Sequence, residues 1–150
     1  MTAVDLADRR LHEAVAARLG ALDQRYTTSR RALVQALVDA ARPLTIAEIV
    51  AEAPGVPQSS AYRNLTVLSE AGVARRLPGA DDFGRFELAE DLGGHHHHLV
   101  CSSCGTVADL ETSPRLERAI DDAARQAAAA SGFEVTGHRV DFDGRCPRCR

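Results

Sequence analysis

Two cysteine pairs and a run of four histidines constrain this chain more than any other feature. Residues 95–104 read HHHHLVCSSC, and a second CxxC motif, CPRC, occupies residues 146–149. All four cysteines of the chain belong to these two motifs. Two CxxC turns together supply the tetrahedral sulfur set that structural zinc prefers. The sequence therefore predicts a structural Zn²⁺ site formed by Cys101, Cys104, Cys146 and Cys149.

The cysteine pairs and the histidine run each have an alternative explanation. A single CxxC is also typical of redox motifs, and two cysteine pairs can form disulfides. The chain shows no secretory segment at its start, which favours a reducing compartment and disfavours disulfides. A remnant of a purification tag is an alternative for the histidine run, but tags usually stand at a terminus, whereas this run is internal and adjoins a CxxC motif.

The histidine run predicts more than one metal site. In an extended segment, successive side chains point to opposite faces. His95 and His97 would then share one face, and His96 and His98 the other. Each face would offer two imidazoles to an ion. We therefore expect up to three sites in all, one built from sulfur and two from nitrogen and oxygen.

Length and composition fit a small globular protein. The 150 residues, 45% of them hydrophobic, have room for one ordinary domain or two small ones. No apolar run approaches the roughly 20 residues that cross a bilayer, so we expect a cytoplasmic protein without a membrane partner. The formal net charge is −3, but residues 23–76 hold seven arginines against five acidic residues, whereas residues 89–150 hold seven against ten.

The first half of the chain has the element order of a winged helix-turn-helix. Apolar spacing and capping signals predict helices over residues 4–19, 30–38, 45–54 and 57–72. Residues 73–77 and 85–89 flank a turn-forming segment at 78–82, which predicts a β-hairpin. In a winged helix-turn-helix the last helix enters the major groove, and its first turn presents side chains to the base edges.

The predicted fourth helix begins with a polar turn that suits DNA. The candidate contacts are Gln58, Ser59, Ser60, Tyr62 and Arg63, with Arg30 at the start of the second predicted helix as a further candidate. Arginine pairs with guanine and glutamine with adenine, while tyrosine and serine reach phosphates or a thymine methyl. The alternative is a polar helix start on an ordinary helical domain, with Tyr62 partly buried. The helix pattern alone leaves both alternatives open.

Residues 90–94 predict a hinge between a DNA-binding domain at 1–89 and a second domain at 95–150. The second domain is expected to contain short strands at 98–100 and 107–110, an alanine-rich helix from Ser113 to Gly132, and a long strand over 133–142. At about 55 to 60 residues its core is marginal, so zinc and dimerisation would both help. The predicted fold class is α+β, a winged helix-turn-helix followed by a small α/β dimerisation domain.

Taken together, these motifs resemble the ferric uptake regulator family of metal-dependent repressors, which includes zinc uptake regulators and peroxide sensors. HHHHLVCSSCG and the later CPRC are close to the family pattern HHxHLxCxxCG … CxxC. Residues 59–65, SSAYRNL, are similar to the recognition-helix stretch usually written TTVYRTL. The resemblance runs from about residue 26 to residue 149. It implies a homodimer that binds a double-stranded, inverted-repeat operator and is not an enzyme.

The resemblance also implies a ligand set for each metal. The four cysteines match the structural zinc site. The sensing site that ties the wing to the dimerisation domain matches His96, His98 and Glu87, with Asp109 as a further candidate. A second site within the dimerisation domain matches His95, His97, Glu117 and His138. The alternatives are a hydrogen-bonded core histidine for His138, on one strand face with Val140 and Phe142, and a solvated helix carboxylate for Glu117.

One departure from the family leaves the sensed metal open. Several iron, peroxide and nickel sensors have a histidine in the loop before the third helix, where this chain has Arg42, Pro43 and Leu44. The ligand from the DNA-binding domain would then be Glu87, Glu90 or Asp91. Imidazole-rich sites with four ligands suit zinc, and added carboxylates favour iron or manganese.

We expect a zinc-sensing repressor of metal-uptake genes, whose regulatory Zn²⁺ cross-links the hinge and fixes the winged helices at the operator spacing. The alternative is an iron-loaded peroxide sensor or an iron sensor with regulatory Fe²⁺. A zinc hydrolase is a remote alternative, because it needs an open coordination position and a general base, and the chain has no helical HExxH motif.

Overall fold

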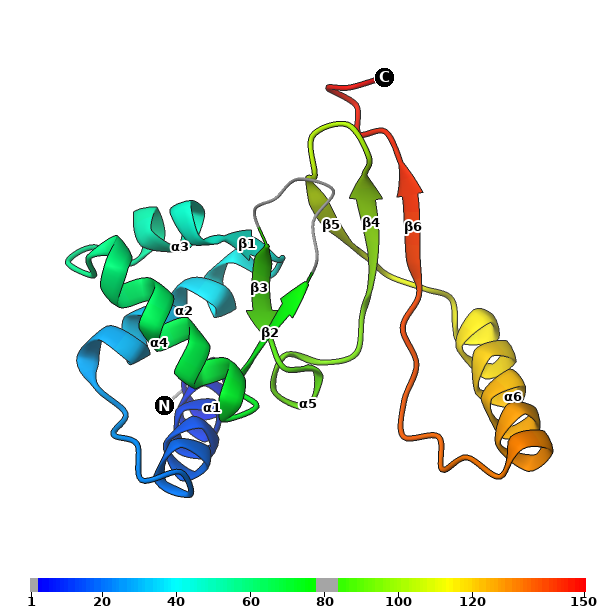
Figure 1. Ribbon diagram of the computed structural model, residues 1–150, viewed down its shortest axis with the longest axis horizontal. Coiled ribbons are helices and arrows are strands. Elements are labelled where there is room, and N and C mark those ends of the chain that lie inside the picture. The colour runs from blue at the N-terminus through cyan, green and yellow to red at the C-terminus, as the bar shows by residue number, and fades with distance from the viewer. Residues whose placement is uncertain (1–2, 78–83) are drawn as a thin grey trace. The chain divides into compact units, whose positions relative to one another are not determined.

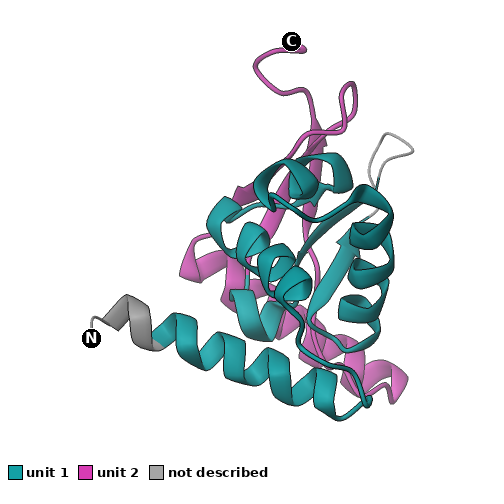
Figure 2. Cartoon of the chain, turned by 90° about the vertical axis from the view of Figure 1, so that its left-hand side faces the viewer, with its two compact units in different colours: residues 1–95 teal, residues 96–150 magenta. Residues whose placement is uncertain are grey.

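The computed structural model describes residues 3–77 and 84–150, with the backbone alone for residues 3–6. The chain divides into two compact units, residues 1–95 and residues 96–150 (Figure 2). The turn predicted at residues 78–82 lies outside the described residues.

The first unit contains the four helices that the sequence predicts (Figure 1). They are α1 (Ala3–Gly20), α2 (Thr28–Ala40), α3 (Ile46–Glu52) and α4 (Gln58–Glu70). The Thr27 hydroxyl caps α2 by accepting from the Arg30 amide at 3.3 Å. Thr45 and Glu48 form the predicted capping box of α3, in which the Glu48 carboxylate accepts from the Thr45 amide at 2.8 Å. Both caps satisfy amides that the first helical turn leaves without partners.

A three-stranded antiparallel sheet completes the first unit. The strands β1 (Leu44–Thr45), β2 (Ala74–Leu77) and β3 (Arg85–Leu88) lie in the order β1-β3-β2. The pair β2–β3 is the predicted hairpin, with Ala74 opposite Leu88 and Leu77 opposite Arg85. The strand β1 was not predicted, because two residues are too few to show a strand period. Three helices followed by this hairpin form a winged helix-turn-helix.

The core of the first unit fixes which side of α4 faces outward. Ala61, Leu65 and Leu68 are fully buried at successive turns of α4 and pack with the apolar side chains of the other elements. Burial of each leucine stabilises the fold by roughly 1.5–3 kcal/mol. Ser59 and Arg63 lie on the opposite side of the helix and are exposed, as are Gln58 and Tyr62. The helix predicted to read DNA therefore presents its polar side to solvent.

The second unit combines a small mixed sheet with one long helix. The strands β4 (His97–Cys101), β5 (Val107–Leu110) and β6 (Asp141–Gly144) lie in the order β5-β4-β6, with β4 antiparallel to β5 and parallel to β6. The helix α6 (Pro114–Ser131) begins at the predicted Ser113 cap and ends at Gly132, whose φ of 75° is left-handed. No helix among the described residues is long and apolar enough to cross a membrane.

The segments at residues 90–94 and 133–142 differ from their predicted structure. The predicted hinge at residues 90–94 contains a short helix, α5 (Glu90–Gly93), at the end of the first unit. Its role as a hinge remains a prediction. The long strand predicted over 133–142 is wrong, because the strand begins only at Asp141. The pairing of β6 with β4 starts at Asp141 and ends at Gly144, so the aromatic and β-branched composition of residues 133–140 finds no strand pairing within the described chain.

Candidate metal centres

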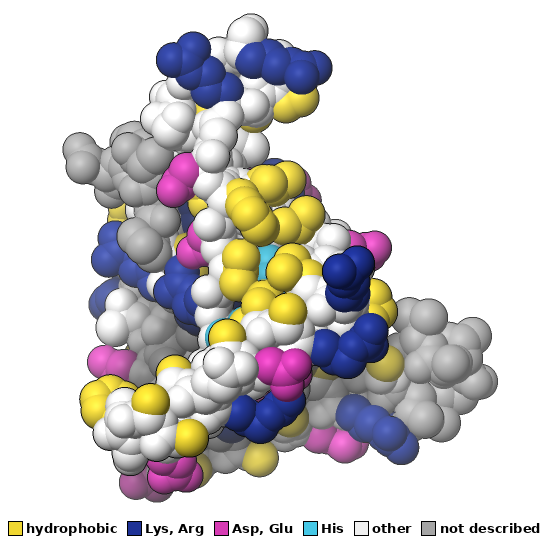
Figure 3. Space-filling view, turned by 90° about the vertical axis from the view of Figure 1, so that its right-hand side faces the viewer, with side chains coloured by type: hydrophobic (Ala, Val, Ile, Leu, Met, Phe, Trp, Pro, Cys, Tyr) yellow, Lys and Arg dark blue, Asp and Glu magenta, His cyan; other side chains and the backbone are white. Residues whose placement is uncertain are grey.

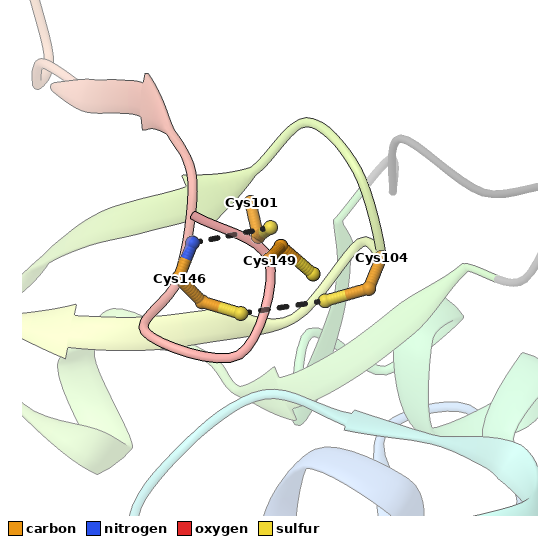
Figure 4. Close-up of side chains that lie close together, drawn as sticks. All are labelled: Cys101, Cys104, Cys146 and Cys149. Carbon is orange, nitrogen blue, oxygen red and sulfur yellow. Dashed lines mark hydrogen bonds between the residues drawn. The ribbon is translucent and has the colours of Figure 1, made fainter.

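The four cysteines converge because β4 and β6 are parallel neighbours. Cys101 ends β4 and Cys104 follows in the adjoining turn, while Cys146 and Cys149 lie in the turn after β6 (Figure 4). The Sγ atoms of Cys104 and Cys146 are 3.7 Å apart, and all four lie within 4.8 Å of one another. A zinc tetrahedron with Zn–S bonds of about 2.3 Å has S···S edges of about 3.8 Å. The four thiols therefore fit Zn²⁺, and the cysteines are not paired in disulfides.

Hydrogen bonds prepare part of this cluster to bind a cation. The Cys146 amide donates to Cys101 Sγ at 3.3 Å, and this bond is the main reason why the pKa of Cys101 falls to about 6. A hydrogen bond with Thr106 at 3.2 Å lowers the pKa of Cys104. Hydrogen bonds to Cys104 and Cys146 instead raise the pKa of Cys149 to about 12. One thiolate thus opposes formation of the next, and only a bound cation would hold all four deprotonated.

A second cluster lies within the second unit where α6 begins. His97 Nε2 is 2.8 Å from one carboxylate oxygen of Glu117, and His138 Nε2 is 3.4 Å from the other. The two imidazole centroids are 5.3 Å apart. An ion with bonds of about 2.0–2.1 Å to nitrogen and oxygen has ligand edges of about 3.3–3.4 Å, so the three side chains fit one ion. His138 comes from the irregular segment before β6, and not from the strand face predicted for it with Val140 and Phe142.

His95 belongs to the first unit, whereas its predicted partners belong to the second. It is the last residue of the first unit, where its Nδ1 contacts the Glu90 carboxylate. Its membership of the cluster of His97, Glu117 and His138 therefore stays a prediction.

A third cluster lies on the opposite face of β4. The rings of His96 and His98 meet edge to face, with centroids 5.1 Å apart. Asp109 on β5 stands directly opposite His98 in the antiparallel register, which places both side chains on one face of the sheet. One ligand atom from each of the three residues lies within 4.8 Å of the others. The alternation predicted from strand geometry is therefore present, with His97 on one side and His96 and His98 on the other.

Asp141 is a neighbour of this third cluster that was not predicted from the sequence. It stands opposite His98 in the parallel pair β4–β6, and its Oδ1 is 3.1 Å from His98 Nδ1. An imidazole that binds an ion through one ring nitrogen generally donates its other N–H to a carboxylate or carbonyl. Asp141 occupies the position of such an orienting group. Only the parallel register of β6 reveals it, because 43 residues separate the two side chains in the chain.

The three acidic candidates of the DNA-binding region all have partners within the first unit. Glu87 on β3 stands opposite Arg75, whose Nε donates to the Glu87 carboxylate at 2.9 Å. Glu90 contacts His95, and Asp91 forms an ion pair with Arg18. The hydrogen bond from Arg18 lowers the pKa of Asp91. Participation of Glu87 in the sensing site remains a prediction.

The predicted DNA contacts differ in exposure. Gln58, Ser59 and Arg63 are exposed, Ser60 is half-buried, and Tyr62 is 53% exposed. Because Tyr62 is this exposed, it does not serve the core of the first unit.

A groove of about 620 Å³ runs along α4 and is lined by Gln58, Tyr62, Thr66, Arg76 and Phe86, among others. Arg30, in contrast, is half-buried and donates hydrogen bonds to other residues of the first unit.

The second unit exposes apolar side chains that a monomer leaves in water. Leu99 and Phe142 are neighbours across β4 and β6 and are 46% and 47% exposed. None of the 18 residues of α6 is buried. Figure 3 shows hydrophobic side chains gathered on one face of the molecule. An exposed apolar pair of this kind is a candidate for an interaction surface.

The chain is similar to known metal-dependent regulators over most of its length. A model of the ferric uptake regulator family matches residues 21–143. The peroxide-responsive repressor PerR of Staphylococcus saprophyticus is 28% identical over 130 residues, which are 84% of this chain and 82% of that protein. The ferric uptake regulation protein of Bacillus subtilis is 30% identical over 131 residues, 83% of this chain and 85% of that protein.

One solved structure has the same fold over nearly the whole chain. The Helicobacter pylori ferric uptake regulator Fur, a structure described as revealing three functional metal binding sites, superposes with a TM-score of 0.74 at 19% identity. The match covers 95% of this chain and 93% of that one. At this identity the likeness shows the α+β fold.

Proposed function

The chain belongs to the ferric uptake regulator family, and on that premise we propose that it is a metal-responsive transcriptional repressor that binds an inverted-repeat DNA operator as a homodimer. Members of this family are regulators and not enzymes, which excludes the alternative of a zinc hydrolase. The observation that carries the proposal is the presence of a winged helix with a polar, exposed α4 and of imidazole–carboxylate clusters in one chain. A cytoplasmic location is part of the proposal.

We assign different roles to the metal clusters. The thiol cluster would hold structural zinc, because its S···S distance of 3.7 Å fits a zinc tetrahedron. His96, His98 and Asp109 would hold the regulatory ion, with Glu87 as the ligand from the wing. Two imidazoles and a carboxylate without sulfur form the donor set that suits iron(II). Several similar proteins are named for responses to peroxide or iron, so we favour Fe²⁺ over the Zn²⁺ expected from the sequence.

The regulatory role would come from the position of the ligands in the chain. His96, His98 and Asp109 belong to the second unit, whereas Glu87 lies on β3 of the wing. An ion bound by both sets would restrict the movement of one unit against the other. The dimer would then favour arrangements in which two α4 helices match the half-site spacing of the operator. Arg75 would support this role by fixing the orientation of the Glu87 carboxylate.

The exposed apolar surface of the second unit supports the homodimer. Leu99 and Phe142 would be covered by a second copy, together with the apolar stripe of α6. A two-fold dimer buries the same patch on both subunits and matches an inverted-repeat operator.

The proposal is tested by measuring the affinity for DNA at controlled concentrations of free metal ion. Fluorescence anisotropy would follow the zinc-loaded dimer on DNA from its own upstream region, with buffered iron(II) added without oxygen and with zinc(II) as a separate titrant. We expect iron(II) to tighten binding by about tenfold or more, within the usual range of allosteric coupling. His98→Ala should abolish the response and leave the thiol site filled.

The outcomes separate the alternatives. Loss of DNA binding on addition of peroxide would identify a peroxide sensor, and an unchanged complex would identify an iron sensor. A response to zinc alone would restore the zinc-sensing alternative. Lack of response to either metal would refute the proposed regulation.

A further inference from the structure

Arg30 lies where three segments of the first unit meet. Its Nε donates to Asn64 Oδ1 on α4 at 2.9 Å. One terminal nitrogen donates to the Arg25 carbonyl at 2.7 Å, and the other donates to Gln24 Oε1 at 2.9 Å. The guanidinium, which belongs to the first turn of α2, therefore joins α2, α4 and the connection between α1 and α2. Every nitrogen of the guanidinium has an acceptor within the unit.

The partners of Asn64 fix the orientation of its amide. A guanidinium can only donate, so the atom that meets Arg30 must be the Asn64 oxygen. The Asn64 amide nitrogen then donates to the Ser60 carbonyl at 2.9 Å. Ser60 lies in the first turn of α4, one turn before Asn64. A continuous chain of hydrogen bonds therefore runs from the start of α2 into the turn that is expected to meet DNA.

The position of this chain of bonds suggests what it does. Asn64 directly follows Arg63, and Tyr62 and Arg63 are exposed DNA-binding candidates on the same helix. The buried side of α4 is held by apolar contacts, and the directed hydrogen bonds of Asn64 add a restraint on rotation of the helix from its less buried side. Base contacts depend on such rotation, because hydrogen bonds to base edges tolerate little error in distance and angle.

We propose that Arg30 is a positioning residue for operator recognition. It sets the rotation of α4 against α2 through Asn64, and it does not itself contact a DNA phosphate. This inference rests on the proposed function, since it requires α4 to read DNA. It also replaces the sequence-based assignment of Arg30 as a direct DNA contact.

The chemistry of the guanidinium makes the inference testable. A lysine keeps the positive charge that a phosphate needs, but it lacks the planar fork that reaches three acceptors at once. A positioning role therefore predicts that Arg30→Lys is about as harmful as Arg30→Ala. A phosphate contact predicts that lysine restores binding.

The experiment measures operator and non-operator affinities of the iron- and zinc-loaded dimer over a range of salt concentrations. The variants are Arg30→Lys, Arg30→Ala, Asn64→Ala and the double variant with both alanines. Arg25→Ala is the matched control, because it removes one positive charge from the same region and keeps the carbonyl that Arg30 binds. Thermal melting and zinc content would verify that each variant is folded.

We expect each single variant to lose about tenfold or more in operator affinity, with the double variant no worse than either alanine variant. Non-operator affinity and the slope of log K against log salt should match the Arg25→Ala control or the wild type. A folded Arg30→Lys protein with wild-type affinity would overturn the inference. So would a slope reduced by about one in Arg30→Ala alone, which indicates a lost phosphate contact. Failure of the wild type to bind the operator would instead overturn the proposed function, and this inference with it.

Discussion

The first unit is held together by an apolar core, whereas the second unit is built around polar and thiol clusters. The core cluster of buried hydrophobic residues lies entirely between Val15 and Leu88. Among the described residues of the second unit, only Cys101 and Val107 are buried hydrophobic residues, and α6 contributes none. We expect a unit of this size with so few buried apolar residues to need metals or a partner for its stability. The two units should therefore respond to different perturbations.

Removal of structural zinc should have the largest effect and should act on the second unit. Structural zinc contributes an apparent 10–16 kcal/mol, roughly, to the folding of zinc-finger peptides. Cys146→Ser or a strong chelator should unfold the second unit and dissociate the dimer, while the helices of the first unit remain. Circular dichroism during heating and sedimentation would measure this. Simultaneous loss of both units would show that the first unit does not fold on its core alone.

A core substitution should act on the first unit. Leu65 is fully buried, so Leu65→Ala should lower the free energy of unfolding by about 2–5 kcal/mol. Zinc content should stay at the wild-type value. Chemical denaturation followed by circular dichroism would measure the loss. Leu99→Ala is the matched control, because Leu99 is 46% exposed in the second unit and its truncation should weaken self-association instead.

Loss of an orienting carboxylate should have an intermediate effect. Asp141→Asn should weaken binding of the regulatory ion about 10–100-fold, as is usual for groups that orient a metal-bound histidine. Competition with an iron(II) chelator would measure the affinity, and the thiol site should keep its zinc. Asp143→Asn, on the same exposed strand, provides the control. Equal affinities of the two variants would remove Asp141 from the site.

The ion pair of α1 with α5 should contribute least. Arg18 lowers the pKa of Asp91, so the stabilisation is present at neutral pH and is lost as pH falls through the lowered pKa of this carboxyl group. Because Asp91 is exposed, Asp91→Asn should cost at most about 1 kcal/mol at pH 7. The cost should vanish at a pH well below that lowered pKa, where the wild-type carboxyl group is protonated. Urea unfolding of the first unit at both pH values would test the sign.

Features encoded by neighbouring residues could be predicted from the sequence. The capping box of Thr45 and Glu48 and the cap at Ser113 are local, because the bonded groups lie three residues apart. The four cysteines could be predicted as one zinc site because two CxxC motifs are among the few ligand patterns that structural zinc accepts. The alternation of the histidines followed from the strand period alone.

Features that depend on distant pairing could not be predicted. Asp141 meets His98 through a parallel register that no local pattern specifies. The strand expected over 133–142 begins only at Asp141, because the β propensity of a segment does not supply a neighbouring strand to pair with. Arg30 remains a predicted DNA contact, and its hydrogen bond with Asn64 depends on a residue 34 positions away in the chain.

The strand β4 also sets a counting rule for the second unit. His97 and Cys101 occupy odd positions of one strand and His98 an even position, so the spacing between the histidines and the first cysteine assigns each imidazole to its side of the sheet. Insertion of one residue between His98 and Cys101 would keep every ligand in the chain. It would nevertheless move His97 and His98 to opposite faces of the sheet relative to Cys101. The side of β4 on which each histidine lies is thus set by the number of residues between it and Cys101, as well as by their identity.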